Sequence, residues 1–357
     1  MKIALVVDDY HGGAGNIAQL LALELKQLHE VCLLVINKTS TPRYDLEGIC
    51  VKEESVAIQG KSKIKGILVS IKKTKKLIAD CNPELIISFI NNNNSIVCLS
   101  QWKTKTPIIV SERSNPLVIY PKFPWNHIRR IAYRRANVVT VQFDIFKNFD
   151  KARFAKKCMV TSNIVEKPAY LKTDWDSEAV RFVTFGRLQD VKRMDLMIKL
   201  FAQAHPQMEN AELHIYGAGP NQEKLEALIR ELQMEKYVYL EGYCKEVHKT
   251  LADNDVYLMT SLQEGFPNGL SEAMAVGLPS VSFRCHDGVA ELAQEETAGF
   301  TVAEGDETAF IEKMVALAKD SSLRREMGLK AQNISEKYSK ERVMEQWYAC
   351  MERSLNE

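Results

Sequence analysis

The sequence has no apolar run close to the roughly 20 residues that a membrane-spanning helix needs. Its first residues are a short apolar stretch followed by acids, which is not the pattern of a signal peptide. The eight cysteines form no Cys-x-x-Cys pair, and the seven histidines show no metal-ligand spacing. These absences predict a cytoplasmic protein with reduced thiols, no disulfide framework and no bound metal.

Charge is nearly balanced overall but is divided unevenly along the chain. Residues 1–166 carry 25 Lys and Arg against 14 Asp and Glu, a net of +11, whereas residues 167–357 carry 22 against 32, a net of −10. A basic first half predicts contact with an anionic surface. No nucleic-acid module is recognisable, so we expect no nucleic acid as partner. The cytoplasmic face of a membrane is the better candidate, with the protein peripheral on it.

The length of 357 residues favours two domains. Strand-like and helix-like segments alternate in the first half, which predicts a mostly parallel sheet with helices on both faces. Strands are expected at 3–7, 31–36, 85–90, 108–110, 138–141 and 158–161, and helices at 16–28, 61–80 and 128–136. The second of these helices is the clearest candidate for membrane contact, because of its lysines: Lys61, Lys63, Lys65, Lys72, Lys73, Lys75 and Lys76.

The alternation breaks at 162–176, where Glu166, Lys167 and Pro168 suggest a linker. A second α/β series follows, with strands expected at 181–185, 213–216, 237–240, 256–259 and 280–283, and a final helix at 340–353. We therefore predict an α/β fold with one domain at 1–166 plus 340–357, and another at 167–339.

Two carboxylates flank a loop rich in Gly, Pro and Asn that follows a predicted strand. Glu264 lies in the turn, and Glu272 lies eight residues later in the first turns of a helix. In open α/β sheets, ligands bind in the crevice at this end of the strands. Backbone amides around Asn268, Gly269 and Leu270 can hold an anion, and the two glutamates can accept hydrogen bonds from hydroxyls. Phosphate recognition beside hydroxyl recognition indicates a nucleotide-sugar.

Six sequence blocks, in order, resemble the retaining glycosyltransferases of family 4. They lie at 12–14, 186–192, 215–220, 240–242, 261–279 and 298–306. The resemblance implies the GT-B fold, in which two Rossmann-like domains face each other across a cleft and the last helix crosses back to the first domain. It also implies that the first domain binds the acceptor and the second binds the donor.

The resemblance assigns roles to particular side chains. Arg187 and Lys192 would neutralise the donor diphosphate, for which Arg offers a planar fork and Lys a compact charge. Glu272 would accept from the ribose hydroxyls and Glu264 from the sugar hydroxyls. We therefore expect Glu264, Arg187 and Lys192 to be catalytic, without a metal or another cofactor. The other expected donor-binding residues are Gly13, Gly186, Gly217, Tyr243, Phe266, Asn268, Gly269 and Leu270.

Four residues of the first half are candidates for contact with the acceptor or the transferred sugar: Gly12, Glu112, Arg113 and His127. Glu112 and Arg113 are equally compatible with a structural ion pair, and His127 with a structural role near a helix start. Many family members follow Gly-Gly-Ala with charged residues, whereas this chain has Gly15 and Asn16.

The expected activity is transfer, with retention, of a hexose or N-acetylhexosamine from a nucleotide-diphosphate sugar, with UDP as the expected nucleotide. The expected acceptor is a glycan carried on a polyprenyl diphosphate. Two alternatives stay open, namely an inactive transferase-like subunit that binds a glycan, and a sugar-nucleotide epimerase of similar fold. The Asp-x-Asp strings at 174–176 and 253–255 are not expected to bind a metal.

Overall fold

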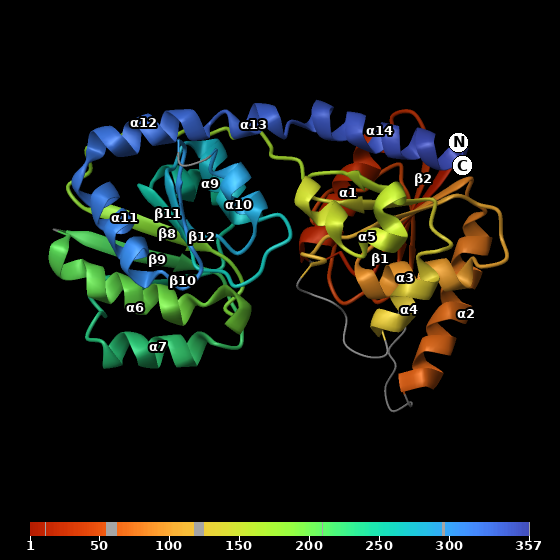
Figure 1. Ribbon diagram of the computed structural model, residues 1–357, viewed down its shortest axis with the longest axis horizontal. Coiled ribbons are helices and arrows are strands. Elements are labelled where there is room, and N and C mark those ends of the chain that lie inside the picture. The colour runs from red at the N-terminus through yellow and green to blue at the C-terminus, as the bar shows by residue number, and fades with distance from the viewer. Residues whose placement is uncertain (11, 55–62, 118–124, 209, 295–296, 357) are drawn as a thin grey trace. The chain divides into compact units, whose positions relative to one another are not determined.

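The computed structural model describes residues 1–356, except 11, 55–62, 118–124, 209 and 295–296. The chain divides into two compact units. Unit 1 comprises Met1–Asn163 and Val343–Glu357, and unit 2 comprises Ile164–Arg342. Each unit is a parallel sheet with helices on both faces (Figure 1).

Unit 1 contains a seven-stranded parallel sheet in the order β3-β2-β1-β4-β5-β6-β7. Its central strands are buried on both faces, as expected for strands covered by helices on either side. The direction of strand order reverses between β1 and β4, so this is the topological switch point. The strands are β1 (Lys2–Val7), β2 (Glu30–Val35), β3 (Cys50–Glu53), β4 (Leu85–Phe89), β5 (Ile108–Ser111), β6 (Val138–Val141) and β7 (Cys158–Val160).

Helices α2 (Lys63–Cys81), α3 (Asn91–Ser100) and α4 (Trp125–Ala132) lie side by side on one face of this sheet, and α1 (Gly12–Leu25) and α14 (Lys340–Asn356) lie on the other (Figure 1). The short segments η1 (Asp144–Asn148), α5 (Lys151–Phe154) and η2 (Ala155–Lys157) precede β7. Within the described residues, no helix combines the length and the apolar character that crossing a bilayer requires.

In unit 1, helix α1 differs from its predicted bounds, and some elements were not predicted. Helix α1 begins at Gly12 rather than at residue 16, so the Gly-Gly pair belongs to the first helical turn and not to a preceding loop. Strand β3 and helix α3 were not predicted. The first residues of α3 are four asparagines, which have a poor helix propensity. Three of them are buried, so tertiary packing stabilises the helix despite this propensity.

Unit 2 contains a six-stranded parallel sheet in the order β10-β9-β8-β11-β12-β13, with its switch point between β8 and β11. The strands are β8 (Val180–Phe185), β9 (Ala211–Tyr216), β10 (Val238–Gly242), β11 (Val256–Met259), β12 (Ser280–Phe283) and β13 (Phe300–Val302). The last of these was not predicted.

The core of unit 2 lies between its sheet and helices α6 (Met194–Ala204), α7 (Gln222–Glu231) and α11 (Glu307–Lys319) (Figure 1). Helices α9 (Asn268–Val276) and α10 (Asp287–Leu292) cover the other face, and α8 (Val247–Ala252) packs against α9. The remaining segments are η3 (Asp190–Lys192), η4 (His205–Gln207), α12 (Ser321–Ala331) and α13 (Ile334–Lys337).

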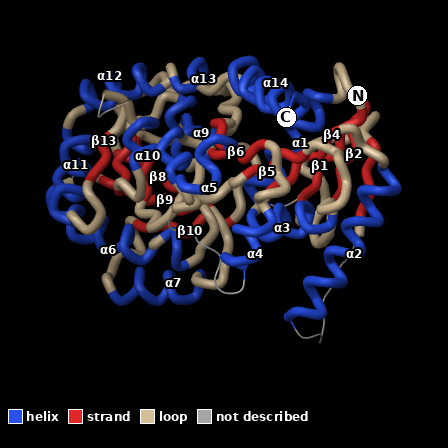
Figure 2. The backbone as a smooth tube through the Cα atoms, turned by 45° about the vertical axis from the view of Figure 1, so that its right-hand side comes forward, coloured by secondary structure: helices blue, strands red, loops and turns tan. Residues whose placement is uncertain are grey.

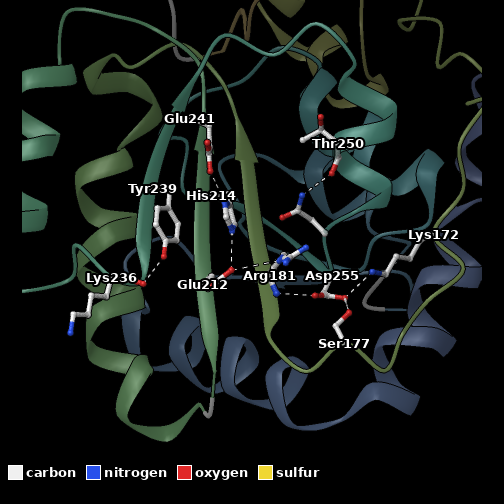
Figure 3. Close-up of polar contacts among 11 residues, drawn as sticks. Lys172, Ser177, Arg181, Glu212, His214, Lys236, Tyr239, Glu241, Thr250 and Asp255 are labelled. Carbon is white, nitrogen blue, oxygen red and sulfur yellow. Dashed lines mark hydrogen bonds and ion pairs between the residues drawn. The ribbon is translucent and has the colours of Figure 1, made fainter.

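The stretch predicted as a linker packs onto unit 2 (Figure 3). Lys172 is buried, and its Nζ lies 2.8 Å from Oδ1 of the buried Asp255, at the amino end of β11. Asp255 also accepts hydrogen bonds from Ser177 Oγ and from the backbone N–H of Arg181. This carboxylate therefore joins the linker to the amino edge of the sheet, at the opposite end of the strands from the expected ligand site.

A second set of polar contacts crosses β8, β9 and β10 on the sheet face shown in Figure 3. Glu212 accepts from His214 Nε2 and lies 3.6 Å from Arg181 Nε, and His214 Nδ1 lies 2.7 Å from Glu241. All four side chains are partly exposed, so each pair adds little to stability.

Helix α14 begins at Lys340 in unit 2 and belongs to unit 1 from Val343 onward. Trp347 is buried in unit 1, where its ring packs against Phe89 at a centroid distance of 6.0 Å and beneath the guanidinium of Arg113 at 5.2 Å. This confirms the prediction that the final helix returns to the first domain.

Candidate functional site

At the carboxyl edge of the unit 2 sheet, the loops after β8 and β9 touch backbone to backbone. Gly217 has φ +142°, and a Cβ on it would lie 1.9 Å from the carbonyl oxygen of Gly186. A Cβ on Gly219 would lie 2.4 Å from the carbonyl oxygen of Leu188. Only glycine fits at these positions, so the Gly-x-Gly of this block keeps the two loops in contact.

The loop that carries Lys192 is fastened to the end of β11. Thr260 Oγ1 donates to the carbonyl oxygens of Lys192 and Arg193. Arg193 Nε donates to the carbonyl of Thr260, and its two terminal nitrogens contact the carboxylate of Glu304 at 2.6 and 3.0 Å. Sequence reasoning missed Arg193 and Thr260, because neither belongs to the motif that carries the resemblance. The left-handed φ of +48° at Arg193 is visible only in the structure.

Lys192 and Glu264 form an ion pair on adjoining loops. Lys192 Nζ lies 2.6 Å from Glu264 Oε1, and the side chains are 26% and 12% exposed. The sequence predicted that Lys192 binds the donor diphosphate and Glu264 the donor sugar. The structure brings the two side chains into direct contact. With the backbone of Gly269 they line a cavity of about 20 Å³, which can hold one water molecule but no nucleotide. A nucleotide at this site would have to bind outside this cavity.

The N-terminus of α9 lies next to this pair. Pro267 precedes the helix and provides no side-chain cap, and the first helical hydrogen bond is donated by Ser271 to the Pro267 carbonyl. The amides of Asn268, Gly269 and Leu270 therefore precede the helical ladder, where a helix presents its positive end. A Cβ on Gly269 would lie 2.4 Å from the hydroxyl of Tyr257 and 3.3 Å from the carbonyl of Phe185, so glycine lets α9 approach β8.

The side chains of the remaining expected donor residues differ in how much of their surface is exposed to solvent. Arg187 and Tyr243 are exposed at the ends of β8 and β10, with Tyr243 81% exposed, and Glu272 is half-buried on α9. Leu270 is fully buried, so only its backbone amide can reach a ligand.

Phe266 is buried, with its ring packed edge-on against Tyr338 at a centroid distance of 5.3 Å. The ring therefore supports the turn, and of Phe266 mainly the backbone is in a position to reach a ligand.

His286 and Cys285 follow β12 and lie against the Glu264–Gly265 turn from the inside. Burial lowers the pKa of His286 to about 4, partly offset by the nearby Glu264 carboxylate. Burial also raises the pKa of the Cys285 thiol to about 12. Both side chains are therefore neutral near pH 7. They are further residues of the site that the sequence motif did not indicate.

In unit 1, Glu112 is completely buried, so its carboxylate offers no surface to a substrate. Its Oε1 accepts from the Tyr133 hydroxyl at 2.5 Å and lies 3.5 Å from Arg129 Nη1. Burial raises the pKa of Glu112 despite the neighbouring Arg129. The expected contact with acceptor or sugar is corrected, because Glu112 is part of a buried structural cluster.

Arg113 does not pair with Glu112 either. Its guanidinium donates to Ser111 Oγ, to the carbonyl and hydroxyl oxygens of Thr161, and to Asn163 Oδ1, and it lies over Trp347. These contacts hold the end of β5 against α14 and the end of β7. The ion pair considered from the sequence is thus replaced by two separate structural arrangements.

The other candidates of unit 1 are exposed. His127 is exposed on α4, and Gly12 and Gly13 are exposed at the N-terminus of α1, with φ +82° at Gly12. The glycine that packing requires is Gly15, on which a Cβ would lie 2.3 Å from the Tyr10 carbonyl oxygen. Gly15 looked like a departure from the family pattern. Its lack of a side chain allows α1 to pack closely against the segment that follows β1.

A strained residue lies at the switch point of unit 1. Ile90, which follows β4 and precedes α3, has φ +74°, an outlier for a β-branched residue. Its N–H donates to the Ser111 carbonyl, and its carbonyl accepts from the Asn94 N–H. Strained backbone of this kind is concentrated at functional sites, and no pattern in the sequence indicated it.

Among the residues that the structure describes, no three His, Cys, Asp or Glu side chains are arranged to hold a metal ion. Groups at the carboxyl edge of unit 2 that suit an anion include Lys192, Arg187 and the α9 amides.

Comparison with known proteins adds the family. A model of group 1 glycosyl transferases matches residues 179–320. The chain is 27% identical over 276 residues to an uncharacterized glycosyltransferase of Methanocaldococcus jannaschii, covering 69% of this chain and 68% of the relative. It is 25% identical over 353 residues, 97% of each chain, to the GalNAc-alpha-(1->4)-GalNAc-alpha-(1->3)-diNAcBac-PP-undecaprenol alpha-1,4-N-acetyl-D-galactosaminyltransferase of Campylobacter jejuni. The solved structure of Anabaena HepE with UDP and glucose is similar, with a TM-score of 0.80, 17% identity and 99% of each chain covered.

Two Rossmann-like parallel sheets on one chain, with a last helix that begins in the second unit and ends in the first, define the GT-B class of transferases. Within that class, this chain belongs to the group 1 glycosyltransferases, family 4, and is related to bacterial transferases of glycans and lipid-linked glycans. It is a glycosyltransferase of the hexosyltransferase type. The resemblance seen in the six motif blocks is confirmed.

Proposed function

We propose that this protein transfers a hexose or N-acetylhexosamine from a UDP-sugar, with retention at the anomeric carbon, to a glycan acceptor carried on a polyprenyl diphosphate. The observation that carries the proposal is the Lys192–Glu264 pair beside the uncapped N-terminus of α9. The Campylobacter relative, aligned over nearly the whole chain, acts on an undecaprenyl-diphosphate-linked glycan by name, which supports the acceptor class.

The donor is assigned to the carboxyl edge of unit 2. Lys192, Arg187 and the amides of Gly269 and Leu270 supply positive charge and donors to its diphosphate, without a metal or other cofactor. Glu272 accepts from the ribose hydroxyls. The exposed ring of Tyr243 offers a stacking surface to the base, an interaction worth about 1–3 kcal/mol in other proteins.

The reaction breaks the bond between the anomeric carbon and the phosphate oxygen and forms a bond to an acceptor oxygen on the same face of the sugar. The departing phosphate takes the proton of the acceptor hydroxyl, so no separate base is required. Lys192 stabilises the charge that develops on the departing diphosphate. When the donor draws Lys192 to its phosphate, Glu264 is left to accept from the sugar hydroxyls.

We assign the acceptor to unit 1, at the carboxyl ends of β1 and β4. The exposed Gly12 and Gly13 at the start of α1 and the strained turn at Ile90 support this location. His127, exposed on α4, is a further candidate for contact with the acceptor or the transferred sugar.

Thermal unfolding in the presence of individual nucleotide-sugars tests the donor. A ligand that binds only the native protein raises the melting temperature, so UDP-sugars are expected to raise it and GDP- and ADP-sugars are not. Stabilisation by another nucleotide alone would contradict UDP as the donor. Product analysis with and without a lipid-linked glycan then separates the alternatives. An epimerase converts the donor without acceptor, and an inactive subunit binds the donor but converts nothing.

Glu272→Gln tests the site itself, because it keeps the side-chain shape and removes the charged acceptor. We expect weaker UDP binding and loss of most transfer, with unchanged unfolding. Glu312→Gln, which removes one exposed acid from α11 in the same unit, is the matched control. Equal activity of the two variants would remove Glu272 from the site.

We further propose that unit 1 binds the anionic surface of the membrane through α2, which extends beyond the sheet (Figure 2). The helix buries Ser70, Thr74 and Leu77 and exposes Leu68, 62% of whose surface is accessible. Its described exposed lysines are Lys72, Lys75 and Lys76. Lys61 lies outside the described residues, and nothing is described of the side chains of Lys63 and Lys65.

Each lysine near an anionic bilayer contributes about 1 kcal/mol. Replacing Lys72, Lys75 and Lys76 by Gln should therefore weaken binding to phosphatidylserine-containing vesicles by about two orders of magnitude at low salt. The control replaces three exposed lysines of unit 2, namely Lys199, Lys236 and Lys319. Equal vesicle binding of the two triple variants, measured by flotation, would contradict the proposal.

A further inference from the structure

Three thiols that the transferase reaction does not use lie together at the amino edge of the unit 1 sheet. Cys32 lies on β2 and is paired in register with Cys50, the first residue of the edge strand β3. Cys81 is the last residue of α2. Cys50 and Cys81 each shift the pKa of the Cys32 thiol, so both lie near it. Cys32 is therefore the middle member of a row of three.

The Cys32–Cys50 pair has the backbone spacing that a disulfide needs. Neighbouring strands lie about 4.8 Å apart, within the range of about 4.4–6.8 Å found between the α-carbons of disulfide-bonded cysteines. The backbone holds Cys81 in place as well, because Lys52 on β3 donates from Nζ to the carbonyl of Asp80 at 2.7 Å. Thus both partners of Cys32 are fixed by neighbouring elements.

Accessibility differs sharply within the row. Cys32 and Cys81 are buried, with 1% and 2% exposed surface, whereas Cys50 is exposed. A reagent in solution can therefore reach Cys50 first. The buried Cys32 is reached from Cys50, and Cys81 from Cys32.

We propose that Cys50, Cys32 and Cys81 form a thiol–disulfide exchange site in which Cys32 pairs alternately with Cys50 and with Cys81. The co-reactant is a small disulfide such as oxidised glutathione. This site is separate from the transferase site, because it lies at the opposite edge of the sheet from the start of α1 and the turn at Ile90.

The steps balance in atoms and electrons. The Cys50 thiolate attacks oxidised glutathione, forms a mixed disulfide and releases one glutathione thiolate. The Cys32 thiolate then attacks the Cys50 sulfur, forms the Cys32–Cys50 disulfide and releases the second glutathione thiolate. One oxidised glutathione is thereby reduced to two thiols. Finally, the Cys81 thiolate attacks the Cys32 sulfur and returns Cys50 to the thiolate.

The rate at which Cys50 reacts with oxidised glutathione should depend on pH. Burial raises the pKa of all three thiols, and the nearby Lys2 opposes this by favouring the thiolate of each. The thiolate is the nucleophile, and its fraction rises with pH. As long as the pH stays below the thiol pKa, exchange should therefore become about tenfold faster for each unit by which the pH is raised.

The test treats the full chain with oxidised glutathione, blocks free thiols and identifies disulfide-linked peptides by mass spectrometry. We expect Cys32–Cys50 and Cys32–Cys81 peptides in the wild type. Cys81→Ser should leave only Cys32–Cys50, and Cys50→Ser should slow formation of Cys32–Cys81 by at least about tenfold. Cys244→Ser, at a partly exposed cysteine of unit 2, is the control and should leave both pairs.

Two outcomes would overturn the proposal. One is a wild-type protein in which Cys50 carries glutathione but no internal disulfide forms. The other is a Cys50→Ser variant that forms Cys32–Cys81 as fast as the wild type. Cys50 is exposed on an edge strand, so its replacement by Ser is expected to leave the fold intact, and circular dichroism checks this.

Discussion

Replacing Lys192 by alanine separates an electrostatic role in transfer from a structural role of its ion pair. Lys192 contacts Glu264 at 2.6 Å and is 26% exposed. If its ammonium neutralises the departing diphosphate, its loss should resemble the loss of one preorganised donor in other enzymes. Such losses reduce kcat about 100- to 1000-fold, which corresponds to about 3–4 kcal/mol of transition-state stabilisation.

The effect on folding should be much smaller. A partly exposed pair that loses one partner leaves a carboxylate that water can still reach, so we expect a fall of about 1 kcal/mol in the free energy of unfolding. Transfer is measured as kcat/KM with a saturating acceptor and the UDP-sugar that stabilises the protein. Unfolding is measured in urea.

The matched control is Lys199→Ala, which removes an exposed lysine from α6 in the same unit. A Lys192→Ala variant whose kcat/KM stays within about threefold of the control would refute the reasoning, since so small a change is under 1 kcal/mol. Comparing Lys192→Ala, Glu264→Gln and the double variant then measures the coupling between the two side chains.

Three further predictions concern packing and titration. Gly217→Ala should lower the free energy of unfolding by several kcal/mol, because its Cβ would overlap the Gly186 carbonyl; Gly305→Ala, with φ +85° and open space around its Cβ, should cost only about 1 kcal/mol. Trp347→Ala should cost about 3–5 kcal/mol in urea unfolding, since the ring is fully buried, and a loss below about 1 kcal/mol would contradict the docking of α14. The pKa of His286 is lowered by burial to about 4, so the unfolded chain takes up the proton first as pH falls from about 6.5, and up to about 3 kcal/mol of stability is lost by pH 4. His286→Asn should flatten that part of the pH–stability curve, and an unchanged slope would show that His286 titrates normally.

The strands of both units could largely be predicted from the sequence. Short apolar runs such as 85–89 and 256–259 are buried on both faces of a parallel sheet, so their composition alone identifies them. Strands β3 and β13 escaped prediction because they lie at sheet edges and are only partly buried, which weakens the apolar signal. The asparagine-rich start of α3 escaped because burial overrides propensity there.

The candidate site was predictable only where its residues belong to a continuous motif. Glu264, Gly269 and Glu272 follow one strand, and their spacing places Glu264 in a turn and the other two in the first turns of one helix. The contact of Glu264 with Lys192 joins positions 72 residues apart, and no local pattern specifies it.

In the first half of the chain, the partners of some side chains could not be predicted from the sequence. Glu112 and Arg113 are adjacent in the chain, and the sequence left open both contact with a substrate and a structural ion pair between them, but they have different partners. One lies in a buried cluster with Arg129 and Tyr133, and the other reaches the end of β7. Both residues follow the end of β5, where strand alternation no longer fixes the direction of a side chain, so adjacency in the sequence says little about contact.

By itself, the sequence determined the class of this protein: two α/β units, a glycine-rich edge and a glutamate pair at the start of a helix. These features depend on apolar periodicity and on local motifs. Both are determined by short-range sterics and by burial, so they can be recognised without knowing how distant segments pack. Only the tertiary structure decided which charged residues are exposed at the candidate site and which are buried in the core. That choice depends on how distant segments pack and on the large free energy required to bury a charge without a partner.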